Sequence, residues 1–443
     1  MKDRIRIRTR IEKRRSEIET KRKANKQDNN LQPGISAFLF LSRPKRTSLQ
    51  RFFIANDFGV ESVLINIQCP KEFSLTDKLE PSLVFIKKVF SCLINSNKDF
   101  VLDFSKCKKI DLGALMVLEI MVQDYQQFQE KFNSSYYYKV NKGISSKPST
   151  VWEVNRILFA LGFITHIPAE KPVKAEYLHL SLLTTSKAKS DVRENRKGWI
   201  CTKIRDFVDM SLKASNVKLN SDSRNSLDNL MGEILNNAED HSELNNFYVD
   251  GVSFKEYDDE GKTIIELNLA IVNFGFSIYE GLEGTKEQNS RIYGFLNDLY
   301  NTHEDQFTKR KSFSKESLFT LYALQEGVSR FKFERKSRGT GTMSFIRAFI
   351  SLGSLGTESP EHLSKLNILS GKANVKCDNV FAPFPTGAGE RVRHRLSLNK
   401  EKDLKILPDQ NYLVTNESSF PGTLLQVKIF MSEDHFDKVL EKN

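Results

Sequence analysis

The sequence predicts an α/β fold, in the broad sense that includes α+β, built from two domains. Strand-like and helix-like segments alternate between residues 60 and 183, which is typical of a small α/β domain. A charged stretch without apolar periodicity follows at residues 186–198 and indicates a linker. Beyond it, a long amphipathic pattern precedes two strands joined by a tight acidic turn. At 443 residues, the chain is long enough for each domain to bury its own core.

Composition narrows the classes of protein to consider. The hydrophobic fraction is 39% and the charged fraction is 28%. No apolar run approaches the roughly 20 residues that span a bilayer, so we expect no membrane span. The first residues, MKDRIRIRTRIEKRR, lack the apolar segment of a secretory signal. The five cysteines are scattered without a CxxC pair, which argues against a zinc site and for a reducing compartment. We therefore expect a cytoplasmic protein.

A basic, flexible tail is expected over residues 1–34. Residues 1–30 hold twelve Lys or Arg and five Asp or Glu, so they carry +7 of the formal net charge of +11. Contact with nucleic acid or another anionic surface is one interpretation of this charge. A solvated tail, or one docked to a partner, is the other interpretation, because neither interleaved aromatic residues nor a base-reading motif accompanies the charges.

The first domain is expected over residues 35–185, after the break at Pro33 and Gly34. Its predicted elements alternate along the chain. The strands are expected at 62–68, 100–104 and 136–140, and the helices at 79–94, at 112–128 and from Val151 to the C-cap candidate Gly162.

The segment FVLDFSKCKKIDLGALMVLEIMV in this domain resembles the STAS domains of bacterial anti-sigma-factor antagonists. In that family, a strand ending in Asp leads through a loop to a helix, and the loop carries an Asp-Ser-Ser-Gly motif with the phosphorylated Ser. The corresponding residues here are Asp111, Leu112 and Gly113, which offer no hydroxyl group. The resemblance therefore implies a STAS-like docking module that is not phosphorylated at this position. A generic strand–loop–helix unit would give a similar pattern.

The second domain is expected over residues 199–443 and contains the most informative segment, GEILNNAEDHS. This segment places Glu233 and Asn237 four residues apart, on one face of a predicted helix. Asn can ligate a magnesium ion that is bound to a polyphosphate, and Glu can orient a nucleophile. The pair is therefore a candidate nucleotide site. An ordinary amphipathic helix with a polar face explains the same spacing.

Three further motifs follow this helix along the chain. The strand predicted at 263–272 runs into NFGFS at 273–277, SRGTGTMSF occupies 337–345, and PGT occupies 421–423. With the helix, they resemble the ATP-binding domain of the gyrase, heat-shock chaperone, histidine kinase and MutL (GHKL) superfamily. The resemblance implies a Bergerat-type two-layer α/β sandwich with a mixed sheet, which binds ATP and Mg²⁺.

The resemblance also implies roles for individual residues. Glu233 would be the general base and Asn237 the magnesium ligand. Asn273 would take the place of the Asp that contacts the adenine amino group, and its amide adds a donor that Asp lacks. The other candidates for nucleotide binding are Gly275, Ser277, Arg338, Gly339, Gly341, Thr342 and Thr423. Residues 278–338 correspond to the mobile lid over the nucleotide, which is long here and contains a basic run at 309–311.

The motif around Glu233 and Asn237 is most similar to the serine kinases that act as anti-sigma factors. The resemblance therefore implies an ATPase or a protein serine kinase in a bacterial partner-switching type of system, with a STAS-like protein as its partner. None of the seven histidines has the setting of a phosphorylated histidine, so we do not expect a histidine autokinase. Two alternatives stay open: an ATP-driven clamp on nucleic acid that forms a homodimer when nucleotide binds, and a non-catalytic nucleotide sensor.

Overall fold

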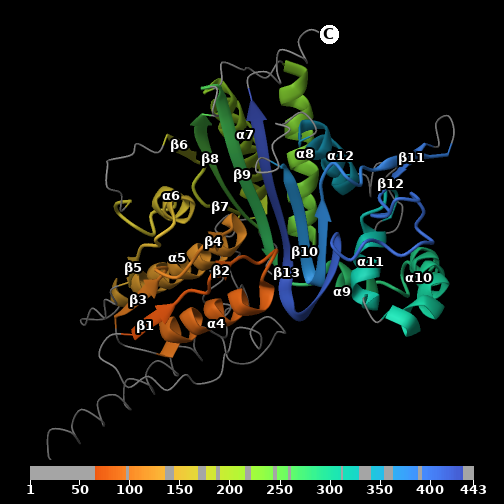
Figure 1. Cartoon of the computed structure of the whole chain (residues 1–443), viewed down its shortest axis with the longest axis horizontal. Helices are drawn as coiled ribbons and strands as arrows, with labels where there is room; N and C mark the ends of the chain where they lie inside the picture. The colour runs from red at the N-terminus through yellow and green to blue at the C-terminus, as the bar shows by residue number, and fades with distance from the viewer. Residues whose placement is uncertain are drawn as a thin grey trace, which may run out of the picture.

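The computed structural model describes residues 65–95, 99–134, 144–167, 176–185, 190–214, 221–242, 247–257, 261–310, 313–328, 341–353, 363–387 and 392–432. These residues form a mixed α/β structure around two main sheets (Figure 1). Within these ranges, none of the helices combines the length and the apolarity of a membrane span. The predicted tail at 1–34 and the predicted strand at 136–140 lie outside the described residues.

The N-terminal unit is built on a three-stranded parallel sheet. Its strands, in spatial order, are β1 (Ile65–Gln68), β3 (Phe100–Asp103) and β5 (Ile144–Lys147). Its helices are α4 (Leu79–Asn95), α5 (Leu112–Ser134) and α6 (Trp152–Ala160), and a short pair joins β2 (Glu72–Phe73) to β4 (Lys109–Ile110). The connections through α4 and α5 cross the sheet in the same direction, so right-handed crossovers place both helices on one face.

The larger sheet has the strand order β10-β13-β9-β8-β6, with β7 also paired to β8. Its strands are β6 (Tyr177–His179), β7 (Leu183–Thr184), β8 (Tyr248–Tyr257), β9 (Thr263–Phe274), β10 (Lys365–Cys377) and β13 (Leu413–Ser432). Every described pairing in this sheet is antiparallel. This differs from the expected mixed sheet because β8 and β9 form a hairpin and β13 runs opposite to both of its neighbours.

One face of the larger sheet is covered by α7 (Ser190–Lys213), α8 (Ser221–Asp240) and α12 (Gly341–Gly353) (Figure 1). Beside β10 lie α9 (Ile278–Glu283) and α11 (Lys315–Ala323), and α10 (Ser290–Arg310) packs on α11. A short hairpin joins β11 (Phe384–Thr386) to β12 (Arg393–Arg395). Apolar side chains from these helices and from the sheet form one buried core.

The opposite face of the larger sheet is covered by the N-terminal unit. α4 contacts β13, and α5 contacts β8, β9 and β13, so both helices lie against this sheet (Figure 1). A second buried core runs from the N-terminal unit into the sheet and includes Val272, Phe274 and Leu424. The backbone N–H of Gly113 donates to Gln426 Oε1 at 3.0 Å. The sheet therefore has helices on both faces, whereas the expected two-layer sandwich has them on one.

A buried ion-pair network also joins α6 to the larger sheet. The guanidinium of Arg156 donates to Glu256 and, at 2.6 Å, to Glu266 Oε2. Lys428 Nζ lies 2.9 Å from the other oxygen of Glu266, and the guanidinium stacks 4.4 Å from the ring centroid of Phe254. Because Glu266 is only 5% exposed, its charge depends on these cations for compensation.

Three expectations about the organisation of the chain need correction. Residues 190–198, expected as a linker, are the first turns of α7, because the helix that packs through Ile200 continues N-terminally. β6 and β7, expected in the first domain, pair with β8 of the larger sheet. Residues 278–310 and 313–328, expected in the lid, contain α9 to α11, whose core side chains include the buried Phe319. The end of the expected lid, residues 329–338, lies outside the described residues.

Two carboxyl groups meet where α5 packs on β8. Glu119 Oε2 and Asp250 Oδ2 are both buried, and neither receives a hydrogen bond within the described residues. Burial and the neighbouring Asp250 raise the pKa of Glu119. A proton shared by the two carboxyls would satisfy both oxygens. His179 Nε2 lies 3.1 Å from the other oxygen of Asp250.

The variant Glu119→Gln is therefore expected to be more stable than the wild type at alkaline pH. Because the pKa of Glu119 is higher in the folded protein than in the unfolded chain, the folded state binds more protons between these two values. The free energy of unfolding of the wild type thus falls as the pH rises through this interval. The variant lacks this contribution, and we expect it to exceed the wild type by about 1 kcal/mol at pH 8.

Urea unfolding of both proteins between pH 5 and pH 9 measures this effect. Glu153→Gln, at an exposed position of α6, is the matched control and should follow the wild type. Parallel pH profiles for the wild type and Glu119→Gln would contradict the shared proton.

Candidate functional site

The predicted motifs meet at one end of the larger sheet, where α8 and α12 pack over it. The end of α8 is fixed to the end of β9 by Ser242, which forms an antiparallel bridge with Gly275. Its hydroxyl donates to the carbonyl oxygen of Phe274 at 3.1 Å. The helix motif and the NFGFS motif are therefore held side by side.

The first turn of α12 lies directly against the polar pair of α8. Asn237 Nδ2 donates to Thr342 Oγ1 at 3.3 Å. A Cβ atom placed on Gly341 would lie 2.8 Å from Glu233 Cβ and 3.0 Å from Glu233 Oε2. Since the first turn of a helix presents unpaired backbone N–H groups and a positive dipole end, it favours an anion such as a phosphate. An exposed carboxylate and a half-buried carboxamide thus border a potential anion site.

A row of polar side chains crosses three neighbouring strands of the larger sheet. Asn273 on β9 is paired in register with Thr423 on β13, and Thr423 is paired with Ser370 on β10. The hydroxyls of Thr423 and Ser370 are 2.8 Å apart, and Ser370 Oγ accepts from the backbone N–H of Ile278 at 2.8 Å. Directly paired residues point to the same face of a sheet. This row faces α8, because Ile271, two residues before Asn273, packs in the core that α8 shares.

Glycines allow the chain to come close enough to form this row. Gly422 has φ +137°, and a Cβ atom there would lie 2.1 Å from the carbonyl oxygen of Asn273. Gly275 has φ +147°, and its N–H donates to the carbonyl oxygen of Pro421 at 3.2 Å. Both positions are unfavourable for a residue with a side chain. The backbone of β13 therefore lies directly against Asn273, the residue expected to contact the base.

Ser277 has a structural partner at this site. It is the N-cap of α9, where its Oγ accepts from the N–H of Glu280 at 3.1 Å. Glu280 Oε2 accepts from the N–H of Ser277 at 2.8 Å in return, which completes a capping box. The hydroxyl of Ser277, predicted to bind nucleotide, is thus buried and engaged in helix capping.

The structure brings most of the predicted residues together in two adjoining groups. Glu233 and Asn237 lie with Gly341 and Thr342, and Asn273 lies with Thr423, as described above. Arg338, Gly339 and the basic residue Lys311 lie outside the described residues. Sequence reasoning missed Ser370. Its signal was the following Gly371, because a glycine inside a strand indicates a bulge, and the β10 register shifts at that point.

A magnesium ion at this site would be held mainly by the phosphate groups of a bound nucleotide and by water. In the described part of the chain, no group of three or more His, Cys, Asp or Glu side chains gathers to hold a metal. Asn237 fits the predicted role, because its Nδ2 donates to Thr342 and its Oδ1 remains as an oxygen donor. Magnesium prefers oxygen ligands and often combines one or two protein groups with substrate phosphates and water.

His303, which precedes a Glu in the expected lid, is not placed for phosphate transfer. Its side chain is buried within α10, and its Nε2 lies 3.0 Å from the carbonyl oxygen of Leu404. Burial lowers the pKa of His303. These contacts indicate a structural histidine.

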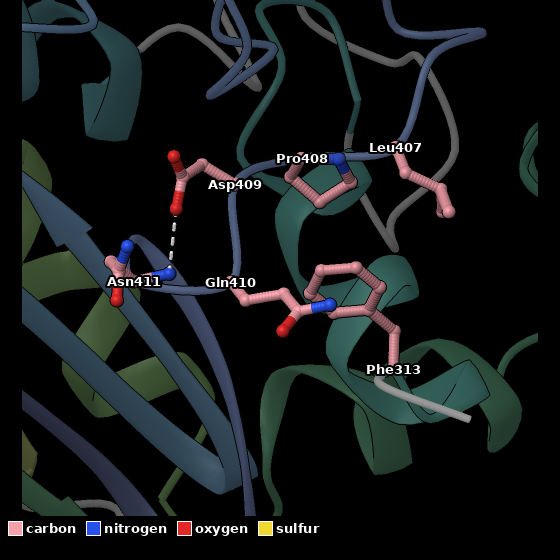
Figure 2. Close-up of a pocket in the computed structure, with 6 residues that line it drawn as sticks. All are labelled: Phe313, Leu407, Pro408, Asp409, Gln410 and Asn411. Carbon is pink, nitrogen blue, oxygen red and sulfur yellow. Dashed lines mark hydrogen bonds between the residues drawn. The ribbon is translucent and has the colours of Figure 1, made fainter. Parts of the chain in front are cut away.

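A separate pocket of about 390 Å³ is lined by Phe313 and residues 407–411 (Figure 2). None of the predicted site residues lines it. Its one carboxylate belongs to Asp409 and accepts a hydrogen bond from the backbone N–H of Asn411 at 2.8 Å. The pocket is therefore distinct from the candidate site built on α8 and α12.

The sequence matches no protein-family model, and neither the curated proteins nor the solved structures gave a match to it.

Proposed function

We propose that the protein binds a nucleoside triphosphate with Mg²⁺ between α8, α12 and the row of polar residues on β9, β13 and β10. In this proposal the C-terminal part is a Bergerat-type ATP-binding domain. It acts as an ATPase or a protein serine kinase in a partner-switching type of regulation. The alternatives of a clamp and of a nucleotide sensor become outcomes of the test below.

The observation that carries the proposal is the contact between two motifs that are far apart in the sequence. The hydrogen bond from Asn237 to Thr342 joins residues 105 positions apart, and it links the helix motif to the second glycine motif. An ordinary amphipathic helix is not expected to place an Asn against the first turn of a helix that follows a Gly-rich segment. The interpretation of α8 as an ordinary polar-faced helix leaves this contact unexplained.

In the proposed site, each group has its own role in nucleotide binding or in the reaction. The first turn of α12 binds the phosphates through its backbone N–H groups. Asn237 would hold the magnesium ion, which would neutralise phosphate charge when bound. Glu233, whose carboxylate lies beside Gly341, accepts a proton from the attacking water or protein hydroxyl. Asn273 binds the base.

The placement of the N-terminal unit supports a docking role for it. Its strand β3 ends at Asp103 and is followed through residues 104–111 by α5, which is the strand–loop–helix order on which the STAS resemblance rests. Gly113, in the segment 111–113 that corresponds to the family's phosphorylated loop, lies against Leu424 and Gln426, with a prospective Cβ 2.7 Å from Leu424 Cδ2. A phosphate group has no room there. We therefore propose that this unit is a permanently docked module and that the phosphate acceptor, if there is one, lies on another protein.

Calorimetric titration of the full chain with ATP and Mg²⁺ tests the proposal. We expect binding by the wild type and a loss of at least tenfold in affinity in Asn237→Ala, because the variant loses a metal ligand. The matched control is Asn236→Ala, which removes a neighbouring, exposed carboxamide of the same helix. Absence of nucleotide binding by the wild type would overturn the proposal.

Phosphate release and phosphate transfer separate the enzyme from the sensor. We expect Glu233→Gln to bind ATP as the wild type does but to lose turnover by about 10²-fold or more. Binding without hydrolysis or transfer in the wild type would identify a sensor. Nucleotide-dependent dimerisation on DNA would favour the clamp.

A further inference from the structure

Asn273 carries a buried hydrogen-bond donor that no described residue of the protein satisfies. Its side chain is 2% exposed, and its Nδ2 finds no acceptor among the described residues. Buried polar atoms of this kind are uncommon in native proteins and call for an explanation. A ligand with an acceptor atom at this point would supply the missing partner.

The surroundings of Asn273 place this donor within the proposed nucleotide site. It stands on the face of the larger sheet that carries α8, at the end of the polar row with Thr423 and Ser370. The close approach of Gly422 to its carbonyl oxygen holds its backbone in place. The hydroxyls of the row can act as donors or as acceptors. They therefore do not restrict the ligand to one pattern of donors and acceptors.

We propose that Asn273 binds the six-position edge of a purine base in either of its forms, so that the site accepts both 6-amino and 6-oxo purine nucleotides. Adenine presents the N6 amino donor beside the N1 acceptor, whereas hypoxanthine and guanine present the O6 acceptor beside the N1–H donor. A carboxamide presents one donor and one acceptor, and a half-turn of its amide group exchanges them. It matches both edges through two hydrogen bonds.

A carboxylate at this position would behave differently. An ionised Asp offers acceptors only, so it accepts from N6 of adenine while its second oxygen faces the N1 acceptor, and it accepts from N1–H of a 6-oxo purine while its second oxygen faces O6. Since an unmatched buried acceptor costs a tenfold to hundredfold loss of affinity by order of magnitude, Asn273→Asp should weaken the binding of both kinds of purine nucleotide. The inference rests on the proposed nucleotide site and concerns its base selectivity.

The decisive pair of ligands is ATP and ITP, because adenine and hypoxanthine have the same ring and differ along this edge. Calorimetric titration of the full chain with each nucleotide and Mg²⁺ should give dissociation constants within about fivefold of each other for the wild type. For Asn273→Asp, the binding of ATP and of ITP should each weaken by about tenfold or more relative to the wild type. Asn236→Asp introduces the same change at an exposed site and should leave both affinities unchanged.

Two results would overturn the inference while leaving the proposed function intact: a wild type that prefers ATP to ITP by more than tenfold, or an Asn273→Asp variant that binds both nucleotides as tightly as the wild type. If neither nucleotide binds to the wild type, the proposed function fails as well, so the two failures are distinguishable. Circular dichroism and thermal melting establish whether the Asp variant is folded. Should it not fold, the wild-type ratio alone decides the question.

Discussion

Gly422→Ala is expected to destabilise the protein by about 3–5 kcal/mol. The backbone at this residue has φ +137°, where residues with a side chain are strained. The added methyl group would also lie 2.1 Å from the carbonyl oxygen of Asn273. That oxygen belongs to the backbone of a central strand and cannot move aside as a flexible side chain would. Strand β13 must therefore separate from β9, which opens the sheet beneath the proposed site.

Urea unfolding at neutral pH measures the loss, and Gly232→Ala is the matched control. Gly232 lies within α8, and a Cβ atom there would have no neighbour within 4 Å. Because Ala favours helix more than Gly does, this control should be stabilised by about 0.5–1 kcal/mol. A Gly422→Ala protein as stable as the wild type would show that the close approach of the two strands is not required.

Arg156→Leu is expected to destabilise the protein by about 3 kcal/mol at pH 7. The substitution removes one of two cations that compensate the buried carboxylate of Glu266, and the uncompensated charge is costly. Lys428 remains in place, so we expect the lower end of the usual range for a broken buried pair. Arg205→Leu, which breaks a more exposed pair with Asp228, should cost less than about 1 kcal/mol.

The pH dependence of this cost provides a second test. Burial by itself raises the pKa of Glu266, but Lys428 and Arg156 bring this pKa below its ordinary value. The ion pairs therefore stabilise the fold above the unfolded-state pKa of Glu266, and this contribution is lost as the pH falls through the folded-state value. In Arg156→Leu the carboxyl takes up a proton more readily. The difference in unfolding free energy between the two proteins should thus be smaller at pH 4 than at pH 7, and an equal difference would contradict this account.

Local sequence patterns predicted the elements where periodicity and flanking signals agree. The predicted helix that carries Glu233 and Asn237 and the hairpin of β8 and β9 are present, and β9 continues two residues beyond its predicted end, to Phe274. The charged start of α7 could not be predicted in this way. Its residues 190–198 show no apolar periodicity, and the helix there continues from a segment that packs through Ile200.

Hydrophobic periodicity alone could not predict that helices cover the second face of the larger sheet. α5 gave a partial signal, because its first residues, LGALMVL, are buried on all sides, and a helix that is apolar all round indicates burial between two layers. The sequence does not say which surface provides the second layer. Only packing brings Gly113 to Leu424 and Gln426.

For the candidate site, the sequence predicted residue types and their order, and the fold supplied their pairing. The contact of Asn237 with Thr342 depends on how α8 and α12 cross. The hydrogen bond between Ser370 and Thr423, which are 53 positions apart in the sequence, depends on the pairing of β10 with β13, and no periodicity encodes that pairing. The unsatisfied donor of Asn273 likewise follows from burial.

The docking of the N-terminal unit on the larger sheet joins residues that leave the ribosome at widely separated times. Gly113 and Gln426 are 313 positions apart, and Asn374 and its acceptor Thr76 are 298 positions apart. At about 5–20 residues per second, synthesis of the intervening chain takes on the order of 15–60 s. Throughout that interval, the apolar side chains of α4 and α5 that later cover β13 face solvent. The newly made chain is therefore a natural client for chaperones until its last long strand has been translated.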